Sequence, residues 1–360
     1  MKRVLVYGMT SNNGGMEAYV MNYFSHFNTD RLIFDFVTDC KAIAWKDEIE
    51  KLGGKIYYIP SRRESLKSHM GGLKKIIKEN KYNVVYFNLL SASGVFSVLA
   101  AHSVKGVKTV VHSHNDNVGN IKVHNILRPI LNRVTDFRLA CSDEAGKFMF
   151  GEKSFNDGEI KVINNAINTE KYKFNHENSK KIREEFLLNN KFVVGHVGRM
   201  CYQKNSEFII EIFNEVLKKK KDSVLLYVGD GEDKPLVEEA IKKYGIEKDV
   251  VLTGMRSDVP KLYSAMDVFL LPSRFEGLAV VAVEAQAAGL PCFVSTNVNP
   301  HTKLVDNFNF VSLEESAEKW ADIILSSVGT ERNCNIQEII DKGFDINSEV
   351  EKLEEFFINL

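Results

Sequence analysis

The sequence has few cysteines, and none of them stands in a metal-binding or disulfide-rich pattern. Its 360 residues contain five cysteines, and no two of these are spaced as CxxC. This spacing argues against a zinc site and a disulfide framework, and it fits a reducing cytoplasm. No apolar run approaches the about 20 residues that a transmembrane helix needs. The basic start MKRVLVYGM is not followed by a small-residue cleavage site. We therefore expect a cytoplasmic protein without a transmembrane anchor.

An excess of charge of either sign is also missing. The net charge is −1, so there is no overall field to attract nucleic acid, and no nucleic-acid partner is expected. The charged fraction of 26% and the hydrophobic fraction of 44% are typical of folded globular proteins. A chain of 360 residues exceeds one ordinary hydrophobic core, which predicts two domains.

Short β-branched runs alternate with longer helical patterns along the chain. Apolar strands separated by helices predict an α/β fold with parallel, doubly wound sheets buried on both faces. Polar sequence from about residue 165 to 191 predicts a linker, which we place at 165–189. We expect two Rossmann-like domains that face a cleft, over residues 1–164 and 190–335. A helical segment at 336–360 is expected to pack back on the first domain. The expected strands are RVLVYG, YNVVYF, KTVVHS, FRLACS, FVVGHVGR, SVLLYVG, DVVLTG, DVFLLPS and PCFVS.

Two cations follow the strand FVVGHVGR. Ligands of parallel sheets bind beyond the carboxyl ends of the strands, so Arg199 and Lys204 are placed to hold a diphosphate. Two solvated surface charges explain the same residues, and this is the commoner outcome for such a pair. Gly229 and Gly231, after the next strand, permit a tight loop, which alone is a weak signal.

The stretch LLPSRFEGLAVVAVE gives a sharper signal. We expect a helix from about Leu278 to Ala288, preceded by a loop that contains Glu276. The amides of Gly277, Leu278 and Ala279 would then lie at a helix N-terminus, which is an anion site of the kind that phosphates use.

Glu284 lies about two turns into this apolar helix. A buried carboxylate needs hydrogen-bond donors, because burying it unpaired costs several kcal/mol or neutralises it. A vicinal diol offers two O–H groups for its two oxygens. A structural Arg or Lys is the alternative partner.

The first predicted domain offers a loop and a histidine pair. Gly14 and Gly15 follow the first strand, where a backbone without side chains lets a ligand approach, although the pattern is not GxGxxG. His112 and His114 end the strand KTVVHS. With Ser113 between them, they are expected to point to opposite faces, so we predict no zinc site from this pair.

These motifs together resemble the GT-B glycosyltransferases of the large retaining family 4, the "glycosyl transferases group 1" set. The resemblance covers nearly the whole chain and includes Gly14-Gly15, His114, VINNAIN, Arg199 with Lys204, VGDGE, and the E-x7-E pair Glu276 and Glu284. The runs GGMEAYVMNYF and HSHN look most like the exopolysaccharide and capsule subset.

The resemblance implies a role for each motif. Glu284 would bind the ribose of a nucleotide-sugar, with uridine preferred to guanosine as the base, and Glu276 would bind the hydroxyls of the donor sugar. The diphosphate would lie on Arg199 and Lys204. The other residues implied at the donor site are Gly15, Gly229, the amides of Gly277, Leu278 and Ala279, the base-proximal Met255 and Arg256, and His114 as a contact to the donor sugar.

The resemblance also implies the reaction. It implies a hexosyl transfer with retention to a saccharide or polyprenyl-linked acceptor, without cofactor or metal. The sequence has no D-x-D, and two cations with a helix N-terminus can stabilise a leaving diphosphate. Two alternative functions stay open: a GT-B sugar-nucleotide epimerase, and a non-catalytic subunit that binds a nucleotide-sugar.

Four positions depart from the usual family pattern. The usual Gly after Lys204 is Asn205, the usual EGFG is EGLA with Ala279, and the usual NG is Asn165-Ala166. The stretch STNVNPHTKLVDN lacks the common Gly-Gly-x-x-Glu. None of these removes a charged ligand, so they affect the expected donor pose rather than the expected reaction.

A basic segment adds an expectation about the membrane. SRRESLKSHMGGLKKIIKEN carries six cations, which predict peripheral contact with anionic lipid at the inner face of the membrane. A solvated helix face explains them equally well.

Overall fold

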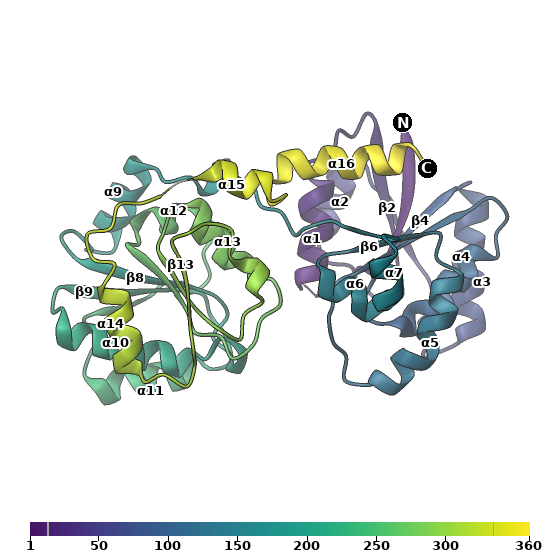
Figure 1. Ribbon diagram of the computed structural model, residues 1–360. Helices are drawn as coiled ribbons and strands as arrows, with labels where there is room; N and C mark the ends of the chain where they lie inside the picture. The colour runs from purple at the N-terminus through teal and green to yellow at the C-terminus, as the bar shows by residue number, and fades with distance from the viewer. Residues whose placement is uncertain (13, 334) are drawn as a thin grey trace. The chain divides into compact units, whose positions relative to one another are not determined.

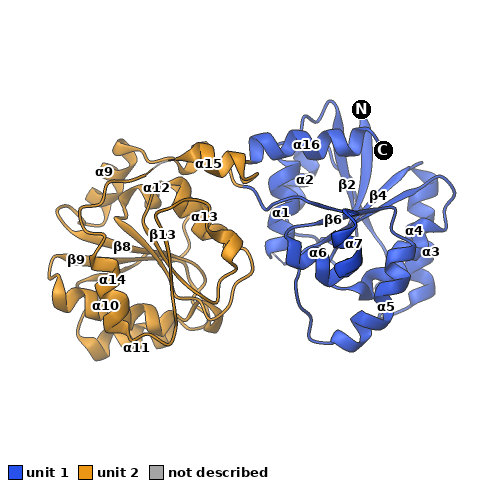
Figure 2. Ribbon diagram, viewed as in Figure 1, with its two compact units in different colours: residues 1–166, 346–360 blue, residues 167–345 orange. Residues whose placement is uncertain are grey.

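The chain folds into two compact units. The structure is a computed structural model that describes residues 1–12, 14–333 and 335–360. Unit 1 comprises Met1–Ala166 and Ile346–Leu360, and unit 2 comprises Ile167–Asp345. The two units are coloured separately in Figure 2.

Unit 1 contains a seven-stranded parallel sheet in the order β3-β2-β1-β4-β5-β6-β7. The strand order reverses between β1 and β4, and open parallel sheets bind ligands at the carboxyl ends of such a pair. The strands are β1 (Lys2–Tyr7), β2 (Leu32–Thr38), β3 (Ile56–Tyr58), β4 (Val84–Leu89), β5 (Lys108–Ser113), β6 (Phe137–Ala140) and β7 (Ile160–Val162).

Unit 2 contains a six-stranded parallel sheet in the order β10-β9-β8-β11-β12-β13. Here the order reverses between β8 and β11. The strands are β8 (Phe192–Val197), β9 (Ser223–Val228), β10 (Val250–Leu252), β11 (Val268–Leu271), β12 (Cys292–Ser295) and β13 (Phe308–Val311).

Helices cover both faces of the unit 1 sheet (Figure 1). One apolar cluster joins the sheet to α1 and α16, and a second joins it to α3, α4, α5 and α6. The helices are α1 (Gly15–Phe24), α2 (Lys46–Lys51), α3 (Leu66–Glu79), η1 (Ala92–Gly94), α4 (Val95–His102), α5 (Ile121–Arg133), α6 (Asp143–Phe150), α7 (Glu152–Asn156) and α16 (Ile346–Ile358).

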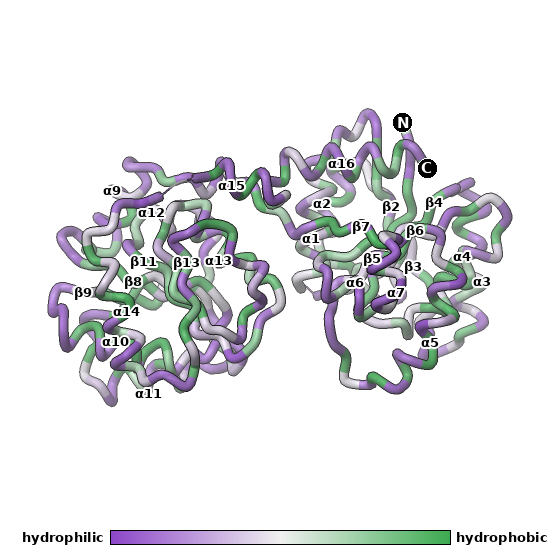
Figure 3. Tube along the Cα trace, in the orientation of Figure 1, coloured by the Kyte–Doolittle hydropathy of each residue, from purple (hydrophilic) through white to green (hydrophobic). Residues whose placement is uncertain are grey.

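The unit 2 sheet is covered in the same way. One cluster packs α12 and α13 against the sheet, and another packs α10, α11 and α14 against its other face. In Figure 3 the strands of both units are mostly hydrophobic in colour. The helices are α8 (Thr169–Tyr172), α9 (His176–Glu185), η2 (Tyr202–Lys204), α10 (Ser206–Lys219), α11 (Lys234–Tyr244), α12 (Val259–Ala265), α13 (Val280–Ala287), η3 (Pro300–Thr302), α14 (Ala317–Leu325) and α15 (Ile336–Asp341).

The α/β class with parallel, doubly wound sheets is confirmed, and all nine expected runs contain strands. Four further strands, β2, β3, β7 and β13, were not expected. The apolar run of β2 is interrupted by Asp35, which is fully buried. Arg3 binds its carboxylate through two nitrogens at 2.6 and 2.7 Å, and the Tyr82 hydroxyl donates to it at 2.6 Å. These partners make a buried charge tolerable inside a strand.

The unit boundaries differ from the expected domain boundaries in two places. The segment expected as a linker, 165–189, contains α8 and α9, which belong to unit 2 and contact α12. The segment 336–360 is divided, because α15 belongs to unit 2 and α16 to unit 1. Apolar side chains of α16, among them Leu353 and Phe357, lie in the core with α1 and the unit 1 sheet.

Candidate active site

Two loops meet where the strand order of unit 2 reverses. One follows β8 and carries Lys204, and the other follows β11 and carries Glu276. The Lys204 Nζ lies 2.5 Å from Glu276 Oε1, and the two side chains are only 15% and 10% exposed. The Ser273 hydroxyl donates to the same oxygen at 3.2 Å. Two residues predicted to touch different parts of a donor are therefore partners of each other in this structure.

Backbone and side-chain bonds hold these two loops together. The Arg274 amide donates to the Gln203 carbonyl at 2.8 Å. Asn205 takes a left-handed conformation with φ 60° and donates from Nδ2 to the Pro272 carbonyl at 3.2 Å. Asparagine tolerates this conformation better than most residues. The departure from the usual glycine thus keeps the backbone geometry and adds a bond that fixes Lys204 beside the Glu276 loop.

Arg199 lies in the loop after β8 with its side chain 70% exposed. Its Nε pairs with Glu232 Oε2 at 2.8 Å. An exposed pair of this kind contributes little stability, because water screens it. The guanidinium can therefore exchange Glu232 for an incoming anion at small cost.

Gly229 holds backbone against backbone rather than leaving room for a ligand. Its φ is +139°, and a Cβ added there would lie 2.0 Å from the Gly198 carbonyl oxygen. Its amide donates to the Gly254 carbonyl at 3.0 Å. The loops after β8, β9 and β10 therefore touch through this residue. Gly277 is the opposite case, because a Cβ there meets nothing within 4 Å.

This contrast gives a first prediction. Gly229→Ala should lower the free energy of unfolding by about 2 kcal/mol or more, through strain and the backbone clash. Gly277→Ala is the matched control and should leave it within about 0.5 kcal/mol. Urea denaturation of both variants measures the difference. Equal stability of the two variants would contradict this packing role for Gly229.

Helix α13 begins two residues later than expected, at Val280, and ends at Ala287. The amides of Gly277 and Leu278 donate to no described residue. The Ala279 amide points to the Thr302 hydroxyl at 3.4 Å, and the Ala279 methyl is buried. Of the three amides predicted for an anion, the structure therefore leaves those of Gly277 and Leu278 available.

Glu284 is half-buried and is held by two tyrosines. The Tyr172 hydroxyl donates to Oε1 at 2.7 Å, and the Tyr263 hydroxyl donates to Oε2 at 2.8 Å. Burial raises the pKa of Glu284, while both tyrosine hydrogen bonds and the charge of Lys204 oppose the rise. Each carboxylate oxygen has a further lone pair, so a diol can still be accepted.

The alternative partner for Glu284, a structural cation, is not found. Among residues 1–12, 14–333 and 335–360, no Arg or Lys forms an ion pair with it. No sequence pattern pointed to Tyr172, because it lies 112 residues from Glu284 in the polar segment assigned to the linker. Tyr263 lies in a short helix, α12, with nothing to distinguish it from a core aromatic residue.

Met255 and Arg256 lie in the loop after β10. Met255 is 86% exposed. The Arg256 guanidinium pairs with Asp258 and with Glu185, each at 2.8 Å, and lies over the Phe186 ring at 5.5 Å. Contact with a base is therefore open to Met255, whereas Arg256 already has internal partners.

In unit 1, His112 and His114 lie on the same side of β5, and the expectation of opposite faces was wrong. Residues two apart on a strand share a face. The rings stack with centroids 4.2 Å apart, and Tyr19 packs edge-on against both. His114 Nε2 bonds to Asn88 Oδ1 at 2.7 Å, and burial lowers the pKa of His114 to about 3. His114 is therefore neutral at physiological pH.

Gly15 is the first residue of α1 and is exposed, with no atom within 4 Å of an added Cβ. Asn13, in the same predicted loop, lies outside the described residues. A pocket of about 250 Å³ lies beside this loop, at the carboxyl ends of β1, β2 and β4 where the strand order reverses. Its walls include Thr10, Asp39 and Asn88.

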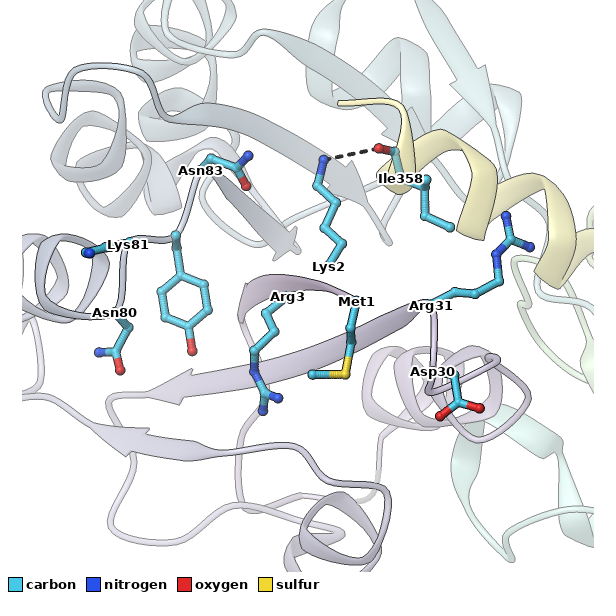
Figure 4. A pocket seen from close by; sticks show the side chains of 10 residues that line it. Met1, Lys2, Arg3, Asp30, Arg31, Asn80, Lys81, Asn83 and Ile358 are labelled. Carbon is cyan, nitrogen blue, oxygen red and sulfur yellow. Dashed lines mark hydrogen bonds between the residues drawn. The ribbon is translucent and has the colours of Figure 1, made fainter.

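A larger pocket of about 750 Å³ lies at the opposite edge of the unit 1 sheet (Figure 4). Three of its four cations already have partners. Arg3 binds Asp35, Arg31 lies 3.6 Å from Glu354, and Lys2 donates to the Ile358 carbonyl at 3.4 Å. These groups tie α16 and the strand ends together, so we assign this pocket no role in the chemistry.

Two family comparisons match successive parts of the chain. The family described as "Glycosyl transferases group 1" matches residues 178–335, and "Glycosyltransferase Family 4" matches residues 13–171. The chain belongs to the GT4 type of GT-B glycosyltransferases. The predicted family and the prediction of a transferase enzyme are thus confirmed.

Relatives of this glycosyltransferase share the whole length or most of it. "Putative glycosyltransferase EpsF" of Bacillus subtilis is 29% identical over 97% of this chain and 94% of its own. A "UDP-Gal:alpha-D-GlcNAc-diphosphoundecaprenol alpha-1,3-galactosyltransferase" of Escherichia coli is 29% identical over 80% and 78%. HepE of Anabaena, solved in complex with UDP, shares the fold with a TM-score of 0.81 and 20% identity over 100% of both chains.

Proposed function

We propose that this glycosyltransferase moves a sugar, with retention, from a UDP-sugar to a saccharide or lipid-linked saccharide during surface polysaccharide synthesis. The observation that carries the proposal is the Lys204–Glu276 pair, which lies at the carboxyl edge of the unit 2 sheet just before α13. A cation and free helix-terminal amides suit a diphosphate, and neighbouring carboxylates suit hydroxyls.

The site residues then take distinct roles. Lys204, Arg199 and the amides of Gly277 and Leu278 bind the diphosphate and stabilise the charge that develops on it as the glycosidic bond breaks. Glu276 orients sugar hydroxyls. Glu284, with its two tyrosines, accepts the ribose diol, and Met255 lies against the base.

Unit 1 contributes the acceptor site and two further contacts in this proposal. The pocket of about 250 Å³ beside the α1 loop supplies polar walls for acceptor hydroxyls. His114, neutral and donating from Nε2 to Asn88 Oδ1, has Nδ1 left to accept one hydrogen bond from a sugar hydroxyl. The exposed start of α1 at Gly15 leaves the backbone accessible.

The choice of UDP is supported by two relatives. The E. coli relative is named for a UDP-sugar and an undecaprenol-linked acceptor, and HepE was solved with UDP. These names also favour transfer over the epimerase and over the non-catalytic subunit.

Incubation of the protein with UDP- and GDP-sugars and a saccharide acceptor tests the proposal. A new glycoside whose anomeric configuration matches the donor supports it. Epimerised donor without a glycoside would indicate the epimerase, and an unchanged donor the non-catalytic subunit. A thermal-shift screen selects the donor first, because a ligand at ~100 times its dissociation constant adds about 2.7 kcal/mol of stability.

We also expect transfer to continue in the presence of EDTA. The proposal assigns the charge of the leaving diphosphate to Lys204, Arg199 and backbone amides, and no step requires a divalent ion. Initial rates with and without EDTA, measured on protein freed of metal beforehand, provide the test. Loss of transfer that manganese or magnesium restores would overturn this assignment.

A further inference from the structure

The exposed aromatic side chains of unit 2 lie on the two loops of the candidate site. Among the described residues of this unit, Tyr202 and Phe275 are the only exposed Phe, Tyr or Trp, at 67% and 55%. Tyr202 begins η2, in the loop that carries Lys204, and Phe275 directly precedes Glu276. One exposed ring on a surface needs no explanation, but two rings that both border one site do.

Neighbouring side chains on these loops face different environments. Lys204 and Glu276 are 15% and 10% exposed and pair with each other, whereas the rings of Tyr202 and Phe275 face solvent. A 3₁₀-helix has three residues per turn, so side chains two residues apart on η2 lie on different sides of it. A ligand held by the Lys204–Glu276 pair therefore leaves the two rings uncovered.

Hydrogen bonds hold the backbone that carries Phe275. The Gln203 Nε2 donates to the Phe275 carbonyl at 3.2 Å, and the Asn297 Nδ2 donates to the Arg274 carbonyl at 3.0 Å. The Glu276 amide donates to the Asn297 carbonyl at 3.3 Å. A side chain on a fixed backbone loses less conformational entropy when it binds a ligand than one on a mobile loop.

Arg274 adds a positive charge to the same surface. Its Cζ lies 4.5 Å from the centroid of the Tyr202 ring. The side chain is exposed, and no acidic residue in the described part of the chain forms an ion pair with it. Arg199, in the loop after β8, is by contrast paired with Glu232. A guanidinium that lies over a ring keeps its N–H groups for an anion, and two of them match a carboxylate or a phosphate.

We propose that Tyr202, Arg274 and Phe275 bind an acidic saccharide, which is the acceptor of the transfer. The apolar C–H faces of its sugar rings pack on the two aromatic rings, and Arg274 binds its carboxylate or phosphate group. The inference rests on the proposed function and deepens it, because it adds an acceptor contact outside the unit 1 pocket and gives the acceptor a chemical class. A nucleobase is a poorer occupant, since the proposed base contact, Met255, lies in the loop after β10.

Titration of probe sugars into the full-length protein tests the inference. UDP is present at saturation so that the donor site is filled, and ligand-observed NMR measures the binding of methyl glucuronide, glucose 6-phosphate and methyl glucoside. Wild type should bind at least one acidic probe about tenfold more tightly than methyl glucoside, because only the acidic probes gain a charge-assisted bond to Arg274. The acidic probe that binds more tightly identifies the anion.

Two variants separate the charge from the rings. Arg274→Gln should raise the dissociation constant of that acidic probe about tenfold and leave methyl glucoside unchanged. Tyr202→Ala with Phe275→Ala should also raise the dissociation constant of the acidic probe about tenfold, because the apolar contact is lost. The affinity for UDP, measured by calorimetry, should stay at the wild-type value in both variants.

Matched variants on other surfaces of unit 2 serve as controls. Lys243→Gln removes an exposed cation that lies over the Tyr244 ring at 5.5 Å. Leu236→Ala with Val328→Ala shortens two apolar side chains that are 44% and 46% exposed. Both controls should bind the acidic probes as wild type does.

Three results would overturn the inference. The first is a wild-type protein that binds the acidic probes no more tightly than methyl glucoside, and the second is wild-type affinity for the acidic probe in both variants. The third is weaker UDP binding by Tyr202→Ala with Phe275→Ala, which would assign the rings to the donor. Glycoside formation by the wild-type protein tests the proposed function separately: its absence, with the acidic probe still bound through Arg274, would refute the transfer but not the saccharide site.

Discussion

Replacing Lys204 by methionine should lower kcat for transfer about 100- to 1,000-fold. The ammonium is the least exposed cation of the site and lies beside the α13 N-terminus, where the proposed diphosphate leaves. Removal of one preorganised donor from such a charge costs about 2.7–4 kcal/mol in the transition state. Methionine keeps the length and apolar stem, so the change isolates the charge. Steady-state rates with saturating donor measure the effect.

Loss of folding has to be separated from loss of chemistry in this variant. Lys204→Met leaves the 10% exposed Glu276 without its cation, which destabilises the fold. The double variant with Glu276→Gln should recover stability without recovering turnover. Lys218→Met, which removes a cation paired with Glu215 at the far end of α10, is the matched control and should retain wild-type kcat. A Lys204→Met enzyme with wild-type turnover would refute the assignment.

Most of the fold could be predicted from the sequence, because buried parallel strands consist of continuous apolar runs. β8 and β11 are such runs, and their carboxyl ends are where Lys204 and Glu276 meet. β2 escaped detection because Asp35 breaks its run, and the Arg3 and Tyr82 groups that neutralise this cost lie 32 and 47 residues away. A local sequence pattern cannot show partners that lie so far away along the chain.

The same distinction between local and distant determinants applies to the candidate site. Positions set by local backbone were predictable, as for Gly277 before α13. Pairings were not, because they depend on which loops the sheet brings together. Glu276 was expected to face a sugar and also binds Lys204, and Gly229 was expected at a ligand but packs on Gly198. The histidine pair was a different case, since strand periodicity alone places His112 and His114 on one face.

Glu284→Gln should weaken binding of free UDP by roughly 1.5–3 kcal/mol, because the amide loses charge-assisted acceptance from the ribose diol. The dissociation constant of UDP should rise about 10- to 150-fold. Glu276→Gln is the control within the site. Free UDP lacks the sugar, so its affinity should stay the same, or increase as Lys204 loses a competing carboxylate. Transfer from the full donor should still fall in that variant. Calorimetric titration of UDP into both variants measures the contrast.

The raised pKa of Glu284 predicts that Glu284→Gln, although it weakens UDP binding, does not lower the free energy of unfolding. Burial raises its folded-state pKa above the ordinary 4.5, so the folded protein holds that proton more tightly than the unfolded chain. Stability from this group is therefore greatest below pH 4.5, falls as pH rises from there to the folded pKa, and stays reduced at neutral pH. Glutamine removes that penalty, and the Tyr172 and Tyr263 hydroxyls can still bond to an amide, so Glu284→Gln should melt at or above the wild-type temperature. A carboxylate with a purely structural role would give the reverse, with a lower melting temperature and unchanged UDP affinity. Weaker UDP binding together with an unchanged or higher melting temperature would indicate that Glu284 is present for its ligand rather than for stability.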